Sequence, residues 1–181
     1  MRLARRQPLT MLRRRAEGEK TMAFRLAAAA VLAWCALGGL AAAQTGSGMT
    51  MAEIGAVLER SGLPVEISKD GAGEPVIFSQ TSGLSFGLYQ FACGSDGRCN
   101  EFLFSSLFEL EPAMSLAKVN EYNRNAIAGR AFIDQNGEAN IEHLFSVSGP
   151  EDADLVERNL VIWGGVLTDF AIFSGFWSAE S

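Results

Sequence analysis

The stretch PVIFSQTSGLSFGLYQFACGSDGRCNEFLFSSLFEL, residues 75–110, decides the fold of this chain. Apolar residues alternate with small or polar ones along 84–91 and recur along 100–110, and glycine-containing turns separate the apolar runs. An apolar period of two, rich in aromatic and β-branched residues, is typical of β-strands. The stretch therefore predicts three consecutive strands, 75–78, 84–91 and 100–110, which pair as an antiparallel sheet.

The turn between the second and third of these strands is CGSDGRC, residues 93–99. In an oxidising compartment, two cysteines that face each other across a hairpin form a structural disulfide, so we expect Cys93 and Cys99 to be joined. A redox-active pair or another role is the alternative, although redox-active pairs usually have two residues between the cysteines and this pair has five. A zinc site would need two more ligands, and the chain has one histidine.

Two further elements are predicted on the N-terminal side of this stretch. Thr50 and Glu53 have the spacing of a capping box, in which the threonine oxygen accepts a helix N–H and the glutamate reaches back. We expect a helix to follow through Arg60. Residues 64–69 then alternate in polarity and predict another strand.

A helix and two strands are predicted on the C-terminal side. The helix is expected to begin near Ser115 and to end at Gly129. Its apolar positions are Leu116, Val119, Tyr122 and Ile127. Strands 130–134 and 140–147 follow, and Asn136-Gly137 between them predicts a two-residue hairpin turn with positive φ at both central residues.

The last predicted helix opens at Gly149-Pro150, with acidic residues near its positive N-terminal end. Its continuous apolar stripe consists of Leu160, Trp163, Leu167 and Phe170. Residues 160–177 are nearly all apolar, so a membrane span is one interpretation. The glycines and Asp169 inside this run favour the other interpretation, a buried helix packed on the sheet.

Together these elements have the order α-ββββ-α-ββ-α. They predict one α+β domain over residues 51–178, with an antiparallel sheet and helices packed on one face. Residues 44–50 are a short flexible leader before this domain. The chain from residue 44 onward is long enough for one compact domain with a single core.

Residues 22–43 have the composition of a secretory signal peptide. Arg25 precedes an apolar run, and small residues lead to a predicted cleavage site after Ala43. We therefore expect a periplasmic or secreted protein that has no membrane contact after cleavage. An uncleaved N-terminal anchor is the alternative. Cys35 follows a bulky tryptophan instead of the small residues of a lipoprotein site, so we expect it to be discarded with the signal.

Residues 1–21 are an upstream extension or the product of a mis-assigned start, in which case Met22 is the true start. Arg5-Arg6 leaves twin-arginine export open as an alternative to the general secretory (Sec) route. The pair lies far ahead of the apolar run, which favours the general route.

The charge of the expected mature chain differs from that of the precursor. Residues 1–43 hold eight of the fifteen basic residues and two of the twenty-one acidic ones, which leaves seven basic and nineteen acidic residues, a net charge of −12. Binding to phosphates requires clustered Lys and Arg side chains. A nucleic-acid-binding function and binding to anionic lipid are therefore disfavoured.

A polar cluster in the second predicted helix is a candidate interaction site. Asparagine is a poor residue for a helix interior, so Asn120 and Asn123 are predicted to have specific partners. Arg124 lies four positions after Asn120, on the same helix face, and is included in the predicted site. The alternative is an exposed, weakly capped helix end. His143, the only histidine, is either a general base or a half-buried strand residue with one hydrogen bond.

Three motifs resemble the YbjN family, which is described as bacterial regulators of sensory transduction. The residues that carry the resemblance are Gly62-Leu63-Pro64-Val65-Glu66-Ile67, Phe86 to Cys93 with Gly97-Arg98-Cys99, and Val119 to Arg124 with Gly129 to Asp134. The resemblance covers most of residues 49–177. It implies a fold similar to type III secretion chaperones and implies no enzymatic activity, cofactor or catalytic residue. The export signal and the cysteine pair set this chain apart from cytoplasmic members.

The expected function is therefore that of an exported, non-catalytic module that binds an unidentified protein or peptide, with no cofactor or metal. One alternative is an envelope hydrolase whose site is assembled from dispersed carboxylates and His143. The other alternative is a domain that binds a small ligand between the last helix and the sheet.

Overall fold

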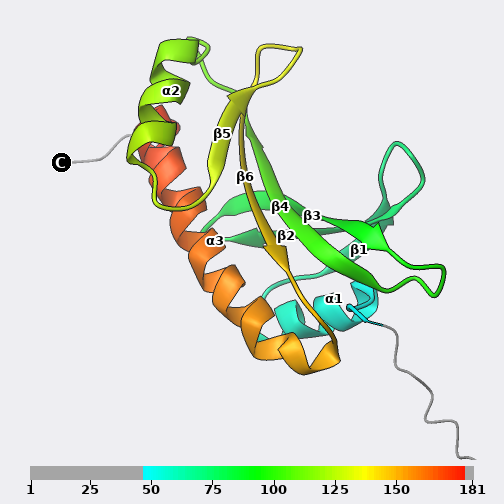
Figure 1. Cartoon of the computed structure of the whole chain (residues 1–181). Coiled ribbons are helices and arrows are strands. Elements are labelled where there is room, and N and C mark those ends of the chain that lie inside the picture. Colours follow the sequence, from blue (N-terminus) through cyan, green and yellow to red (C-terminus); the bar gives the residue numbers. More distant parts are fainter. Residues whose placement is uncertain (1–46, 178–181) are drawn as a thin grey trace, which may run out of the picture. The chain divides into compact units, whose positions relative to one another are not determined.

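The computed structural model describes residues 47–177, and these form one sheet with covering helices (Figure 1). The sheet has six antiparallel strands in the order β1-β2-β3-β4-β6-β5. The elements are α1 (Met51–Arg60), β1 (Glu66–Lys69), β2 (Pro75–Thr81), β3 (Leu84–Cys93), β4 (Cys99–Phe108), α2 (Leu116–Asn125), β5 (Arg130–Ile133), β6 (Ala139–Ser146), the 3-10 turn η1 (Pro150–Asp152) and α3 (Ala153–Ser174). The α+β class and the predicted order α-ββββ-α-ββ-α are confirmed.

The sheet extends in both directions from the hairpin β3–β4, in which Leu88 lies opposite Phe104. β2 and β1 continue it on one side through successive antiparallel pairs. On the other side, the chain leaves β4, passes through α2 and then forms the hairpin β5–β6. The second strand of this hairpin, β6, pairs with β4. β1 and β5 are therefore the edge strands.

The core lies between one face of the sheet and the helices α1 and α3 (Figure 1). Trp163 of α3 is fully buried and stacks on Phe104 of β4, with ring centroids 5.5 Å apart and an interplanar angle of 8°. Phe86 of β3 meets the same indole edge-on at 5.9 Å. Burial of these aromatic surfaces holds the helical layer on the sheet.

The stripe predicted on the last helix faces this core. Leu160, Trp163, Leu167 and Phe170 of α3 are all buried. The helix thus packs on the sheet, as the second interpretation of this segment predicted. Across residues 47–177, no helix has the length and apolar character needed to cross a membrane.

The turn between β5 and β6 differs from the predicted two-residue turn. Gly137 has a positive φ of 86°, but Asn136 does not have a positive φ. The carboxylate of Asp134 accepts the N–H groups of Asn136 at 2.8 Å and Glu138 at 3.0 Å. These side-chain bonds stabilise a longer turn with one left-handed residue, so the prediction of two is wrong.

A two-residue turn occurs instead between β2 and β3. Ser82 and Gly83 have φ values of 51° and 76°, and the flanking residues Thr81 and Leu84 are register partners. This backbone follows the right-handed twist of paired strands.

The second helix is shorter than predicted. α2 ends at Asn125, and Ala126 is already extended (φ −68°, ψ 133°), so Gly129 does not end it. Of the four apolar positions of the predicted helix, Val119 and Tyr122 are buried, whereas Leu116 is 69% exposed and Ile127 is fully exposed. The helix must stop early because the chain returns at once to form β5 beside it.

Candidate functional site

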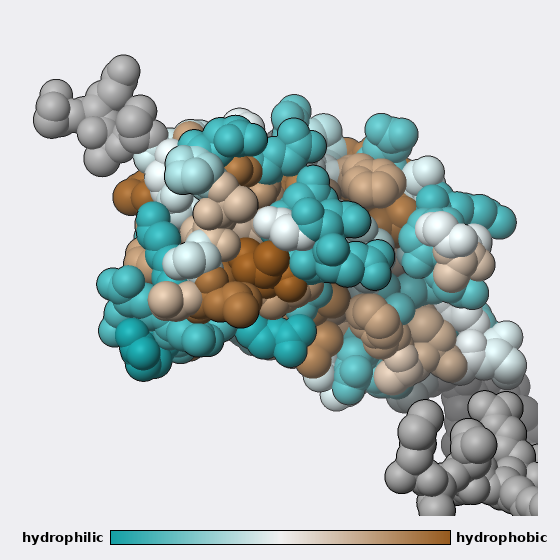
Figure 2. Space-filling view, turned by 90° about the horizontal axis from the view of Figure 1, so that it is seen from above, coloured by the Kyte–Doolittle hydropathy of each residue, from teal (hydrophilic) through white to brown (hydrophobic). Residues whose placement is uncertain are grey.

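The face of the sheet opposite α1 and α3 carries large apolar side chains. Phe78, Leu107 and Leu144 alternate along their strands with residues of the core and are 44%, 45% and 53% exposed. Figure 2 views the domain from the top of Figure 1, and on that side too apolar residues gather among hydrophilic ones. Large apolar side chains left exposed on one face of a sheet are typical of interaction sites.

A groove of about 700 Å³ opens on this side of the sheet. Its apolar lining includes Val65, Phe78, Tyr89 and Leu107. Its polar lining consists of Glu66, Ser79, Gln80, Ser85, Ser105, Ser106 and Asn140. Binding pockets of roughly 300–1,000 Å³ typically combine apolar walls with a few polar groups, and this groove has that composition. We call it the sheet groove.

Gly87 and Tyr89 shape one wall of the sheet groove. A Cβ atom placed on Gly87 would lie 2.8 Å from Cε2 of Tyr89 and 3.0 Å from its hydroxyl oxygen, so the glycine leaves room for the ring. Burial, and to a lesser extent the negative charge of Asp70, raises the pKa of Tyr89 above its usual 10.0. The hydroxyl therefore remains protonated at neutral pH and can donate a hydrogen bond.

The chemistry of the sheet groove is that of recognition. Phe78 and Leu107 can bury an apolar side chain of a ligand, while the hydroxyls of Ser85 and Ser105 can donate to or accept from a peptide main chain. An extended segment bound in this way would contribute apolar contact and hydrogen bonds together.

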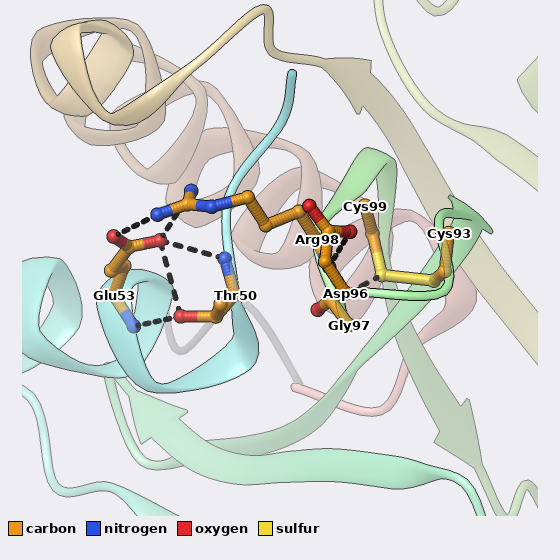
Figure 3. The surroundings of a disulfide bond; sticks show 7 residues. All are labelled: Thr50, Glu53, Cys93, Asp96, Gly97, Arg98 and Cys99. Atoms are coloured by element: carbon orange, nitrogen blue, oxygen red, sulfur yellow. Dashed lines mark hydrogen bonds and ion pairs between the residues drawn. A yellow bond between two sulfur atoms is a disulfide. The ribbon is translucent and has the colours of Figure 1, made fainter. Parts of the chain in front are cut away.

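Cys93 and Cys99 form a disulfide at the turn end of the hairpin β3–β4 (Figure 3). The two residues are direct register partners. Cys99 is fully buried, and Met49 forms a β-bridge to it. The disulfide therefore lies where the segment before α1 meets the sheet.

Arg98 extends from the same hairpin to the N-terminus of α1 (Figure 3). Its guanidinium donates to both carboxylate oxygens of Glu53, at 2.8 and 3.0 Å, and to the carbonyl oxygen of Gly48 at 2.7 Å. Glu53 also accepts the N–H of Thr50 at 2.8 Å, which completes the predicted capping box. We call this group of residues the Arg98 clamp.

The three predicted interaction residues lie on α2 with different surroundings. The side-chain amide of Asn123 accepts the N–H of Ala131 at 2.8 Å and donates to the carbonyl oxygen of Ala131 at 2.9 Å. Asn123 thus supports the edge strand β5 from α2. Asn120 and Arg124 are exposed, and their role in an interaction stays a prediction.

His143 lies on the core side of β6 and is half-buried. Its Nε2 lies 3.0 Å from Oδ1 of Asn159, whose own amide donates to the carbonyl oxygen of Leu155. Because Oδ1 can only accept, Nε2 carries the proton and donates to it. Within the part of the chain that the structure describes, no group of three or more His, Cys, Asp and Glu side chains is placed to hold a metal ion.

The residues of the sheet groove were not singled out from the sequence, although a signal for them exists. Val76-Ile77-Phe78 and Leu88-Tyr89 are apolar at successive positions, which indicates strands that are apolar on both faces. No comparable signal exists for the Arg98 clamp, because 45 residues separate Glu53 from Arg98.

Comparison with known proteins extends over most of the described domain. The family model "YbjN: Putative bacterial sensory transduction regulator" matches residues 50–171. None of the curated proteins that were compared with the chain matches it. The matched range begins at the capping residue of α1 and ends within α3.

Proposed function

This chain belongs to the YbjN family, and from that premise we propose that it is an exported, non-catalytic regulatory domain that binds a protein or peptide in its sheet groove. The family description, a regulator of sensory transduction, supports a regulatory function. The partner is a segment with at least one large apolar side chain. A chaperone-like mode of binding, in which the domain holds an extended segment of another protein, fits this proposal.

One observation carries the proposal. Phe78 and Leu107 remain about half exposed on the sheet face that α1 and α3 leave open, and together with Tyr89 they line a groove with hydroxyl and amide groups. Exposed aromatic and aliphatic groups at the centre of a polar rim are the usual anchors of protein interfaces. Asn120 and Arg124 of α2 are candidate secondary contacts.

Two features support export. The disulfide between Cys93 and Cys99 is of the kind that persists in oxidising compartments and is rare in the cytosol. The composition of residues 22–43 favours a signal peptide that is cleaved after Ala43. In this proposal the domain acts in the periplasm or outside the cell.

Affinity capture from the native envelope fraction tests the proposal. The tagged chain is recovered, its N-terminus is read by mass spectrometry, and the bound proteins are identified. We expect a bait that begins at Gln44 and a near-stoichiometric partner. Substitution of Phe78 and Leu107 by Asp should release this partner, because charged side chains would then occupy the apolar centre of the groove.

Leu116→Asp is the matched control, since Leu116 is an exposed apolar residue on α2, outside the sheet groove. A partner that binds the groove variant as well as it binds the control would contradict the proposed surface. A bait that retains residues 22–43 would contradict cleavage after Ala43.

A small ligand is the second candidate occupant, because the groove volume of about 700 Å³ also lies within the size range of small-molecule pockets. Native mass spectrometry of the bait distinguishes the two. A bound small molecule that is lost in the variant carrying Asp at positions 78 and 107 would replace the peptide hypothesis.

A further inference from the structure

The outward face of α3 is apolar at its centre. Residues spaced by three or four positions lie on one face of a helix, and on α3 the exposed face consists of Asp154, Arg158, Val161, Ile162, Gly165, Asp169 and Ile172. Val161, Ile162 and Ile172 are 78%, 44% and 50% exposed. The outward face of a surface helix is usually polar, so this one is typical of a helix with a partner.

A second groove, of about 580 Å³, runs beside this face. α3 contributes Ile162, Gly165, Asp169 and Ile172 to it, and the segment 125–128, from the last residue of α2 onward, forms the opposite wall. Ile127, which is fully exposed, belongs to that wall. We call it the α3 groove.

Gly165 lies at the middle of the exposed face. No atom would lie within 4 Å of a Cβ placed on it, so the glycine is not required by packing inside the described domain. Glycine in a helix interior costs about 1 kcal/mol relative to alanine. Its absence of a side chain allows another helix to approach α3 closely at this point, and interaxial distances depend on the size of the side chains at the crossing.

Two of the three charged residues of this face, Arg158 and Asp169, have opposite charges and lie on either side of Gly165. Arg158 precedes the glycine by seven positions and Asp169 follows it by four, which is about 10 Å and about 6 Å along the axis. Neither residue forms an ion pair within residues 47–177. When the same helix is laid antiparallel on this face, each Arg158 comes within reach of the opposite Asp169.

We propose that two copies of this chain associate through α3, antiparallel and centred near Gly165. The N-terminal half of α3 from each copy lies over the α3 groove of the other, so that Val161 enters the groove and Arg158 pairs with Asp169. The contact is isologous, with the same surface used by both copies, which is the usual form of a two-fold dimer. Complementary charges fix the antiparallel register.

The dimer leaves the sheet groove free, because α3 lies on the opposite side of the sheet. A dimer would therefore present two sheet grooves and could bind a partner with two segments more tightly than one copy can. The association through α3 does not depend on the function proposed for the sheet groove.

Light scattering coupled to size-exclusion chromatography tests the association on the full-length gene product, isolated from the compartment in which it accumulates. We expect twice the mass of one chain. Val161→Glu should weaken the dimer by about tenfold or more, because it buries an unpaired charge in the α3 groove. Leu144→Glu, at an exposed apolar site on the sheet, should leave the mass unchanged. A single-chain mass at the highest soluble concentration would overturn the proposal.

Two variants test the register. Gly165→Cys should form a disulfide between two copies on mild oxidation, whereas Leu144→Cys should not. Arg158→Asp and Asp169→Arg should each weaken the dimer, and the variant that carries both exchanges should recover it. A dimer that shows neither the Gly165→Cys crosslink nor this recovery would use a different surface, and the proposed interface would be wrong.

Discussion

Arg98 illustrates how one side chain joins distant parts of the domain. It belongs to the disulfide-closed hairpin, yet its guanidinium holds both oxygens of Glu53 and the carbonyl oxygen of Gly48. A bidentate pair between a guanidinium and a carboxylate fixes geometry as well as charge. The side chain of Arg98 is 17% exposed and that of Glu53 is 35% exposed, so solvent partly screens the pair.

The Arg98 clamp makes stability depend on pH through Glu53. The backbone N–H of Thr50, and then the bond and charge of Arg98, hold the pKa of Glu53 below its usual 4.5, although burial opposes them. Because the folded pKa is depressed, this stabilisation is present above about pH 4.5 and is lost as the pH falls through the folded pKa. We expect Glu53→Gln to reduce the loss of stability in this acid range.

Urea unfolding across the acid range measures this effect. Glu121→Gln is the control, since Glu121 is an exposed glutamate of α2, outside the Arg98 clamp. An acid dependence that is identical in the wild type and in Glu53→Gln would show that Glu53 does not contribute to it.

At the scale of elements, an edge strand has main-chain N–H and C=O groups that no neighbouring strand pairs, and these groups can pair with another chain. β5 is short and lies at the edge of the sheet, and Asn123 of α2 satisfies both main-chain groups of Ala131. The amide of Asn123 therefore acts as a substitute for a neighbouring strand.

Asn123→Ala should lower the free energy of unfolding by about 1–2 kcal/mol and increase aggregation, because it exposes both groups of Ala131. Asn120→Ala is the matched control, three positions earlier on the same helix and exposed. Its effect should be within about 0.5 kcal/mol. Equal stabilities of the two variants in urea unfolding would contradict the role of Asn123.

The hairpin β3–β4 depends on its disulfide. Cys93 and Cys99 are six positions apart, and closing so short a loop stabilises a fold by about 2 kcal/mol. Replacement of both cysteines by alanine should lower the stability by this amount. The isolated protein should contain no free thiol from these residues until it is reduced. A fully reactive pair of thiols in freshly isolated native protein would contradict a structural disulfide.

At the scale of the whole molecule, Trp163 is the largest fully buried side chain between the two layers. Trp163 of α3 is fully buried against Phe104 and Phe86 of the sheet, and its indole N–H has no hydrogen-bond partner. A buried donor without a partner costs roughly 1–3 kcal/mol. The size of the indole, and not its polarity, is therefore what the core requires.

Two substitutions separate these contributions. Trp163→Ala should cost about 3–5 kcal/mol, because it leaves a cavity between α3 and the sheet. Trp163→Phe should cost clearly less, since it keeps an aromatic ring and removes the unpaired N–H. Thermal unfolding measures both, and Leu116→Ala at an exposed site is the control. Equal losses for the two variants at Trp163 would contradict this account.

Local patterns were sufficient for much of the fold. The period of two along 84–91, the spacing of Thr50 and Glu53 and the stripe on α3 all act over a few residues, so the sequence alone predicted the element order, the capping box and the buried helix face. The place of Cys93 and Cys99 on either side of a predicted turn, together with the export signal expected at residues 22–43, predicted their disulfide.

The tertiary structure alone decided how distant residues meet. α2 ends at Asn125 because β5 returns beside it, and the turn at Asn136-Gly137 is longer because Asp134 binds its main chain. The sheet groove and the α3 face exist because packing covers one side of each element and leaves the other open. Local sequence sets which conformations are favourable, but the burial of apolar surface between distant segments selects among them.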